Sequence, residues 1–300
     1  MARYWVGGSG TWDNSTTTHW ASSSGGGGGA SVPTQTDDVI IDSKSGLNGG
    51  TITITATFPF IHDFTSNSGF NYTIDHFEIF GDAEFEAGIT FTDRLDFEAT
   101  ETGHTIKTNG CIFSGLAFTG SGGGWTLLDD LTIVNTPGPY DGSFSLWDGI
   151  FDANDHNITC EGVYLDTGSA PPMSIGIYMG SGTWTLTAND DNQWVWNTNG
   201  IVNKIVECET STIKIVDTTS KTKKFYGGEQ TYNKLWITGN ETRAYYIEDD
   251  NTFNELIIDT PPHTVYFFSS SGDIITTITT LTVNGSSGNN ILSRSEYETY

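Results

Sequence analysis

A repeat with a short period constrains the fold of this chain more than any other feature. The segment TYNKLWITG at residues 231–239 is matched by TFNELIIDT at residues 252–260, at an offset of 21 residues (252 − 231). A third copy, TTLTVNG at 279–285, places Leu281 another 25 residues beyond Leu256 (281 − 256). A period of this length without a helical pattern indicates a stack of similar coils made of short strands.

Similar short strands recur from about residue 50 to residue 295. FEIFG at 77–81 and LAFTG at 116–120 share a pattern of alternating apolar residues followed by Gly, and they lie 39 residues apart (116 − 77), near twice the period. Gly, Asn, Asp or Ser separates the strands. The sequence therefore predicts an all-β fold, a single-chain parallel β-helix with two or three strands per coil. A β-propeller is the alternative, but its blades need about 40–45 residues each.

The first 42 residues differ from the rest of the chain. Trp5, Trp12 and Trp20 are interleaved there with Gly and small polar residues, and GGGGGASVP precedes the first buried strand, DDVIID. We expect residues 1–42 to form a small cap or attachment module and residues 43–300 to form the β-helix. A cap would cover the strand edges that an open solenoid end exposes. The three tryptophans are candidate anchors for a larger assembly.

A Gly-rich turn that leads into Trp occurs several times. GSGTW stands at 8–12 and again at 180–184, and GSGGGW stands at 120–125. A phosphate-binding loop would need Gly-Lys-Ser/Thr followed by a helix, and these motifs contain no Lys. We interpret them as corners between strands, where Gly permits backbone conformations closed to other residues.

The charge of the chain limits its partners. It has 37 Asp and Glu residues against 12 Lys and Arg, a formal net charge of −25. Such a surface repels nucleic acid and anionic lipid headgroups, so we expect neither nucleic-acid binding nor membrane insertion. The N-terminal MARYWVGGSG has no apolar signal-peptide core. We therefore expect synthesis in a host cytoplasm without a signal peptide, and release by lysis as part of an extracellular virus particle.

Several of these motifs together resemble a family of phage-associated β-helix proteins found among tail and virion structural proteins. The resemblance rests on WVGGSGTWDNSTTTHW, GGGGGASVPTQTDDVIID, FTGSGGGWTLLDDLTI, GSGTWTLT, KKFYGGEQTYNKLWITG and NTFNELII, in that order. It implies a right-handed parallel β-helix with an N-terminal module. It also implies a non-enzymatic bacteriophage protein of the tail, a fibre or the particle surface, with other virion proteins as partners and a possible part in host attachment. A homotrimer is plausible on symmetry grounds.

Two other functions remain open from the residues. A tailspike-like protein that binds or depolymerises glycans would need two carboxylates about 5–10 Å apart. Asp93, Asp96, Glu98 and Glu101 lie in one run, TDRLDFEATE, and residues two apart on a strand share a face. With 37 acidic residues such pairs arise by chance, so no catalytic residue is assigned. A bacterial surface adhesin is the second alternative, and it would require export.

Aromatic residues offer one candidate contact surface. Trp194 and Trp196 alternate around Val195 in NQWVWN. If Val195 points inward, both tryptophans share the outer face of the strand. The pair is then the best candidate for contact with a host-surface glycan or a protein partner; the alternative, which is the more common role of such rings, is that both belong to the core.

The sequence implies no cofactor. Acidic pairs suit turns and, less often, Ca²⁺, but calcium-loop spacing is missing around Asp37-Asp38, Asp129-Asp130, Asp190-Asp191 and Asp249-Asp250. The six histidines are scattered without ligand spacing. Cys111, Cys160 and Cys208 are nearly evenly spaced, and we expect buried apolar side chains at similar places in the repeat.

Overall fold

The structure is a computed structural model that describes most of the chain. The described residues are 1–57, 59–134, 142–165, 175–187, 194–198, 204–217, 221–239, 243–259, 263–269, 275–284 and 292–297. They form strands, turns and bends. Among them there is no helix long and apolar enough to cross a membrane. This all-β content agrees with the sequence prediction.

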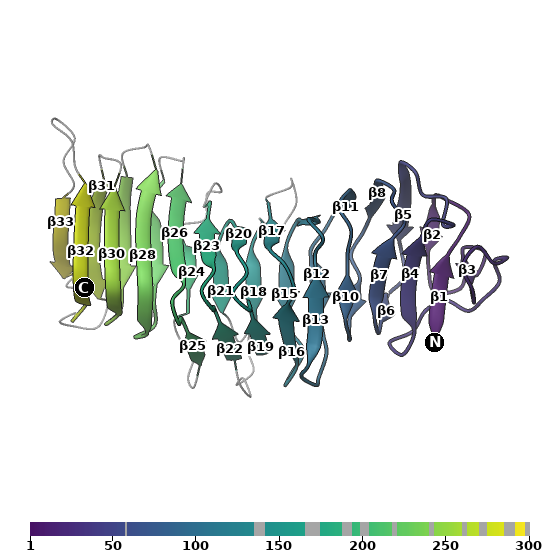
Figure 1. Cartoon of the computed structure of the whole chain (residues 1–300), viewed down its shortest axis with the longest axis horizontal. Coiled ribbons are helices and arrows are strands. Elements are labelled where there is room, and N and C mark those ends of the chain that lie inside the picture. Colours follow the sequence, from purple (N-terminus) through teal and green to yellow (C-terminus); the bar gives the residue numbers. More distant parts are fainter. Residues whose placement is uncertain are drawn as a thin grey trace.

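The strands wind into three sheets along one rod, with the two termini at opposite ends (Figure 1). From β4 to β25, each coil gives one strand to each sheet in turn, and strands of successive coils pair in parallel. The chain is therefore a parallel β-helix.

Sheet A starts at the N-terminal end of the rod and ends at β25, before the last strands of sheets B and C. It comprises β3 (Trp20–Ala21), β1 (Ala2–Trp5), β4 (Asp38–Asp42), β7 (Phe64–Asn67), β10 (Ala83–Glu84), β13 (His104–Lys107), β16 (Gly124–Leu127), β19 (Gly149–Asp152), β22 (Ile175–Tyr178) and β25 (Ile205–Glu207).

Sheet B runs along the whole rod. It comprises β2 (Gly10–Trp12), β5 (Gly50–Ile54), β8 (Tyr72–Ile74), β11 (Ile89–Phe91), β14 (Ile112–Phe113), β17 (Leu131–Ile133), β20 (Ile158–Cys160), β23 (Thr183–Leu186), β26 (Thr212–Asp217), β28 (Thr231–Gly239), β30 (Thr252–Asp259) and β32 (Thr277–Asn284).

Sheet C begins one coil later. It comprises β6 (Phe60–Ile61), β9 (Glu78–Ile79), β12 (Leu95–Phe97), β15 (Leu116–Phe118), β18 (Phe144–Leu146), β21 (Val163–Leu165), β24 (Trp194–Asn197), β27 (Lys223–Tyr226), β29 (Arg243–Glu248), β31 (His263–Ser269) and β33 (Leu292–Tyr297).

The repeat predicts the strand register. Thr231 of β28 lies opposite Thr252 of β30, and Leu256 lies opposite Leu281 of β32. These coils contain strands of sheets B and C alone, because sheet A ends at β25. Nearer the N-terminus, Ile79 and Phe118 both face Phe97, so the 39-residue offset spans two coils. Both expected coil types, with two and with three strands, are thus present.

Stacked side chains fill the interior. In sheet C, Phe97 and Phe118 stack with ring centroids 4.9 Å apart, and Phe118 continues to Phe144 at 5.2 Å. All three rings are buried. Because each coil covers the apolar residues of its neighbours, stability comes from the stack rather than from any single coil.

The cysteines are buried and unbridged, as expected, but they do not occupy equivalent places. Cys160 lies in β20, whereas Cys111 and Cys208 lie in turns between sheets A and B. Coil length varies, so even spacing in sequence does not mark one position in the repeat.

The Gly-Trp motifs lie at corners, as predicted. The first Gly of each GSGTW has a left-handed backbone, with φ of 76° at Gly8 and 64° at Gly180. The second is needed for close approach, since a Cβ on Gly182 would lie 2.1 Å from the carbonyl oxygen of His156 in the preceding coil. The Trp that follows enters the core, and Trp12 and Trp184 are both buried.

Candidate functional site

The outer face of sheet C carries the best-defined group of polar and aromatic side chains. On β12, Leu95 and Phe97 are fully buried in the core. The alternating residues Arg94, Asp96 and Glu98 therefore point outward. The predicted shared face of Asp96 and Glu98 is present, and their Cα atoms are about 7 Å apart by strand geometry.

Arg94 is the centre of this group. Its Nε and Nη2 donate to the two carboxylate oxygens of Asp96 at 2.6 and 3.0 Å. Its guanidinium also lies 5.4 Å from the ring centroid of Trp147, two coils away, as a cation–π contact. Trp147 remains 40% exposed. The arrangement combines a fixed charge pair with an accessible aromatic face.

Two neighbouring groups have shifted pKa values. Burial raises the pKa of the Glu98 carboxyl above its ordinary value, and the nearby carboxylates of Glu78 and Asp96 add to this effect, although Thr119 donates a hydrogen bond to Glu98. Burial of the His76 ring lowers its pKa, but contacts with Glu78, with the Arg94 carbonyl and with Asp96 outweigh burial and raise it to about 9. The face therefore holds an imidazolium beside carboxyl groups at neutral pH.

This chemistry suits contact with a sugar. An exposed indole can stack on a pyranose ring, while fixed charges and carboxylates can hydrogen-bond its hydroxyl groups. Sequence reasoning found Asp96 and Glu98 but missed His76, Arg94 and Trp147, because the contacts of Arg94 with Trp147 and with His76 cross between coils. Asp93 and Glu101 of the same run do not join the group: Asp93 accepts the backbone N–H of Arg94, and Glu101 is exposed.

Of the two tryptophans in the candidate surface Trp194–Trp196, only Trp194 lies on the outside of the fold. Trp194 is 40% exposed and Val195 is buried, as expected, but Trp196 is fully buried. The register of β24 with β27 shifts between Trp194 and Trp196. This irregularity turns two successive side chains inward. Trp194 alone is available for an outer contact, where its ring packs against that of Tyr226 with centroids 5.6 Å apart.

The three N-terminal tryptophans are not exposed anchors. Trp5, Trp12 and Trp20 are each 1% exposed. Trp20 packs edge-on against Trp5 and Trp12, with centroids 5.0 and 5.1 Å apart. Because these rings are core side chains, a partner cannot bind them in the folded chain. They close the N-terminal end of the β-helix, which corrects the expected anchor role.

The N-terminal segment shares the sheets of the β-helix. β1 pairs with β4 and β2 pairs with β5, both in parallel, so residues 2–12 supply the first strands of sheets A and B. The intervening loop returns as β3, antiparallel to β1. The residues predicted as a separate module thus start the stack that continues from residue 43.

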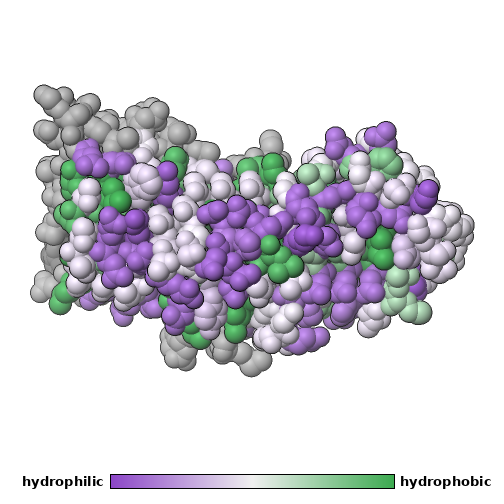
Figure 2. Space-filling model, viewed as in Figure 1, coloured by the Kyte–Doolittle hydropathy of each residue, from purple (hydrophilic) through white to green (hydrophobic). Residues whose placement is uncertain are grey.

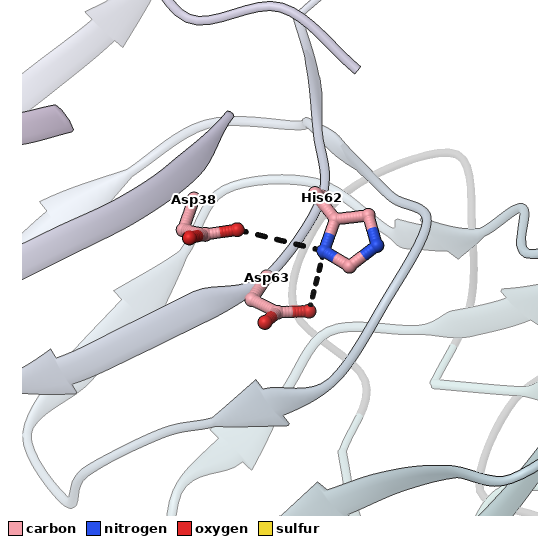
Figure 3. A group of neighbouring side chains, drawn as sticks. All are labelled: Asp38, His62 and Asp63. Atoms are coloured by element: carbon pink, nitrogen blue, oxygen red, sulfur yellow. Dashed lines mark ion pairs between the residues drawn. The ribbon is translucent and has the colours of Figure 1, made fainter. Parts of the chain in front are cut away.

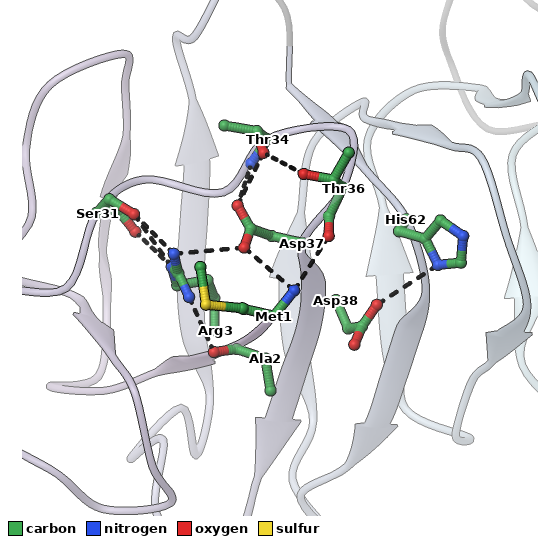
Figure 4. Close-up of polar contacts among 9 residues, drawn as sticks. All are labelled: Met1, Ala2, Arg3, Ser31, Thr34, Thr36, Asp37, Asp38 and His62. Atoms are coloured by element: carbon green, nitrogen blue, oxygen red, sulfur yellow. Dashed lines mark hydrogen bonds and ion pairs between the residues drawn. The ribbon is translucent and has the colours of Figure 1, made fainter.

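Buried polar contacts hold this end together (Figure 4). Arg3 Nη2 lies 3.3 Å from Asp37 Oδ1 and donates to Ser31 Oγ at 2.8 Å. The N-terminal ammonium is 3.4 Å from the same Asp37 oxygen. Burial raises the pKa of Asp37, but hydrogen bonds from Thr34 and the charge of Arg3 prevail and lower it below its usual value. Asp37 is therefore a structural anion of the cap.

Described residues of two other acidic pairs accept hydrogen bonds at corners between strands. Asp129 accepts the backbone N–H groups of Thr108 and Asn109, both at 2.6 Å. Asp249 accepts that of Gly228 at 2.9 Å. Such contacts tie one coil to the next and explain these residues without Ca²⁺. Asp190-Asp191 lies outside the described residues.

One group of described side chains has the composition of a metal site. Asp38, His62 and Asp63 each offer a ligand atom, and these atoms lie within 4.8 Å of one another. The sequence showed the acidic Asp38 but not its partner His62. The two come together because they lie on adjacent coils, which a search for His-x-x-x-His spacing does not detect.

Comparisons with known proteins found no counterpart. No family model, curated protein or solved structure matches the chain. Functional conclusions therefore rest on the residues and geometry described above.

Proposed function

We propose that this protein is a non-enzymatic structural component of a bacteriophage particle, in its tail, a fibre or on its surface. The observation that carries the proposal is the rod itself, in which three sheets of parallel strands run along one axis (Figure 1). Its interior is filled by stacked side chains such as Phe97, Phe118 and Phe144. A rod stabilised along its length by this stack suits a shaft, a fibre or another structural part of a particle.

The lateral surface supports a part in host attachment. Figure 2 shows hydrophilic side chains over much of one face, with smaller hydrophobic groups between them. The formal charge of −25 keeps such a surface soluble and away from other anions. On sheet C, Trp147 and Trp194 are each 40% exposed and available to a neutral host glycan.

Particle composition tests the structural role. Washed, purified phage particles should contain the protein in stoichiometric amount. A protein missing from washed particles contradicts the proposal.

Glycan arrays test the attachment role. Trp147→Ala and Trp194→Ala should each weaken binding of host-surface glycans. The matched control is Trp236→Ala, which removes an indole from sheet B, where it contacts Lys214. Equal binding by all four proteins contradicts the assignment of sheet C.

One observation favours a second candidate, a glycan depolymerase. Glu98 has a raised pKa, whereas Asp96 is held in an ion pair with Arg94. Two carboxyl groups on one face, one of them with a raised pKa, resemble the pair that glycoside hydrolysis uses. Host capsule or lipopolysaccharide incubated with the protein would then release oligosaccharides, and Glu98→Gln would stop the release. No release from several host glycans rejects this candidate.

A further inference from the structure

Three side chains converge on the surface of sheet A beside the N-terminal cap (Figure 3). His62 Nδ1 lies 2.9 Å from Asp63 Oδ1 and 3.5 Å from Asp38 Oδ1. Asp38 and Asp63 are neighbours because Val39 of β4 lies opposite Phe64 of β7. The three side chains are between 38% and 42% exposed, so solvent and ions reach them.

A third carboxylate extends this row. Ala83 lies opposite Phe64, which places Asp82 next to Asp63 on the following coil. Like charges on adjacent strands destabilise a sheet. In the described part of the chain, the ion-pair partners of these three carboxylates are the imidazoles of His62 and His104 rather than Lys or Arg. The row is thus rich in negative charge and in metal-binding nitrogen.

The neighbouring coil leaves room for the group. A Cβ on Gly81 would lie 2.1 Å from Asp63 Oδ1 and 3.0 Å from both Cε1 and Nδ1 of His62. Gly81 does not have a left-handed φ. Backbone conformation therefore does not require glycine at this position, whereas the space taken by His62 and Asp63 does.

A buried nitrogen beside the group has no hydrogen-bond partner. The rings of His62 and His104 pack edge-on with centroids 6.5 Å apart. His104 Nδ1 lies 3.7 Å from Asp82 Oδ1, and its side chain is 13% exposed. Its Nε2 is buried and makes no hydrogen bond to the described residues. An unsatisfied buried polar atom of this kind often marks the place of a water molecule or an ion.

We propose that the side chains of Asp38, His62 and Asp63 bind one divalent transition-metal ion of the Zn²⁺ class. The imidazole of His104 packs beside this site, against the ring of His62. Tetrahedral Zn²⁺ with bonds of about 2.0–2.1 Å holds neighbouring ligand atoms about 3.3 Å apart. The two measured separations, 2.9 and 3.5 Å, bracket that value. Water completes the shell at this partly exposed site.

The donor set selects the class of metal. An imidazole nitrogen with two carboxylates suits Zn²⁺, Ni²⁺ or Cu²⁺, whereas Ca²⁺ and Mg²⁺ prefer oxygen alone. Asp63 Oδ1 also accepts the backbone N–H of Asp82 at 2.8 Å. A carboxylate oxygen has two lone pairs, so this bond is compatible with coordination.

The position of the site gives the ion a structural role. Asp38 follows Asp37, which Arg3 and the N-terminal ammonium hold in the cap (Figure 4). An ion shared by Asp38 and Asp63 would therefore join the coil that begins with β4 to the next coil, which begins with β7, and neutralise stacked carboxylates. This inference does not depend on the particle role proposed above.

Calorimetric titration of the EDTA-treated full chain with ZnCl₂ tests the proposal. We expect one Zn²⁺ per chain and a rise in the thermal unfolding midpoint, because an ion that binds the folded chain stabilises it. CaCl₂ and MgCl₂ should give a smaller rise. Co²⁺ should give intense visible absorption bands that report four-coordinate, tetrahedral binding. A titration without stoichiometric binding would show a simple ion pair and overturn the proposal.

Variants distinguish the site from general binding to an acidic surface. His62→Gln and Asp63→Asn should abolish the Zn²⁺ response and the Co²⁺ bands. The matched control is His156→Gln, since His156 lies 3.7 Å from Asp130 without a third ligand in the described chain. A response that persists in His62→Gln, or one that His156→Gln loses equally, overturns the proposal. Circular dichroism in EDTA checks folding, and Asp38→Asn replaces any variant that fails it.

Discussion

The indole Nε1 of Trp196 donates a hydrogen bond to the hydroxyl oxygen of Tyr232 at 3.0 Å, and both side chains are buried. Tyr232 in turn donates to the carbonyl oxygen of Gly227 at 2.8 Å. The chain of bonds crosses the core from β24 of sheet C to β28 of sheet B. It lies where the coils change from three strands to two, so it links the three-strand part of the rod to the two-strand part.

Removal of the Tyr232 hydroxyl should destabilise this junction. Tyr232→Phe leaves the Trp196 indole N–H and the Gly227 carbonyl without this partner in the core. We expect the free energy of unfolding, measured by urea denaturation, to fall by about 1–3 kcal/mol. Tyr266→Phe, which removes a hydroxyl from a half-buried ring, should cost less than about 0.5 kcal/mol. Equal losses in the two variants would show that the junction does not depend on this bond.

The corner glycine Gly182 should not tolerate a larger side chain, because there is no space for a Cβ atom. Gly182→Ala places a methyl group 2.1 Å from the His156 carbonyl oxygen, so β23 must move away from the preceding coil. We expect a loss of about 1–3 kcal/mol in urea denaturation. Gly27→Ala is the control, because a Cβ there meets nothing within 4 Å, and its effect should be below about 0.5 kcal/mol. Gly182→Ala as stable as the control would contradict the corner assignment.

The register of the C-terminal coils was predictable from sequence because Thr231 and Thr252 begin near-identical patterns, which align even though successive offsets are 21 and 25 residues. The position of Trp196 was not predictable. The pattern Trp-Val-Trp predicts that side chains alternate between the outside and the core. The irregular register that buries Trp196 comes from the pairing of β24 with β27. Backbone pairing with a distant segment therefore overrode the local pattern.

The site residues show the same limit. Asp96 and Glu98 were found because two residues on one strand share a face by geometry. Arg94 meets Trp147 across two coils, and Asp38 meets His62 across one. Such contacts depend on the length of each coil, which changes with its corner insertions and has no local sequence signal.

The cysteines should be unreactive in the folded chain. Burial raises the pKa of the Cys111 and Cys208 thiols to about 12 and raises that of Cys160 as well. The thiolate is the reactive form, and at pH 8 it is scarce and inaccessible. We expect a thiol-specific disulfide reagent to label none of the three in native buffer and all three in denaturant. Rapid labelling of the native chain would show that the strand or corner that holds one of these thiols opens.

His76 should remain charged at unusually high pH. Its pKa is raised to about 9 in the fold, against about 6.5 in the unfolded chain. The stabilisation is thus full below pH 6.5 and is lost as pH rises through about 9. NMR titration of the imidazole should give a midpoint near 9, and Glu78→Gln should lower it by removing a carboxylate. A midpoint that Glu78→Gln leaves unchanged would contradict this account of the shift.

Glu98 should also lower stability as pH rises, but from a lower pH than His76. Its pKa is raised mainly by burial, so the folded chain holds this proton more tightly than the unfolded chain. Its contribution is most favourable at low pH and weakens as pH rises from about 4.5 through the folded-state pKa. Glu98→Gln keeps an acceptor for Thr119 but removes the titration. Its stability relative to the parent chain should therefore increase between pH 4 and pH 8 in urea denaturation.

Glu101→Gln alters an exposed carboxylate of the same run and should show no such trend. A constant difference between the Glu98 variant and the parent across this range would mean that Glu98 is hydrated in solution and does not form the partly buried acid of the sheet C face.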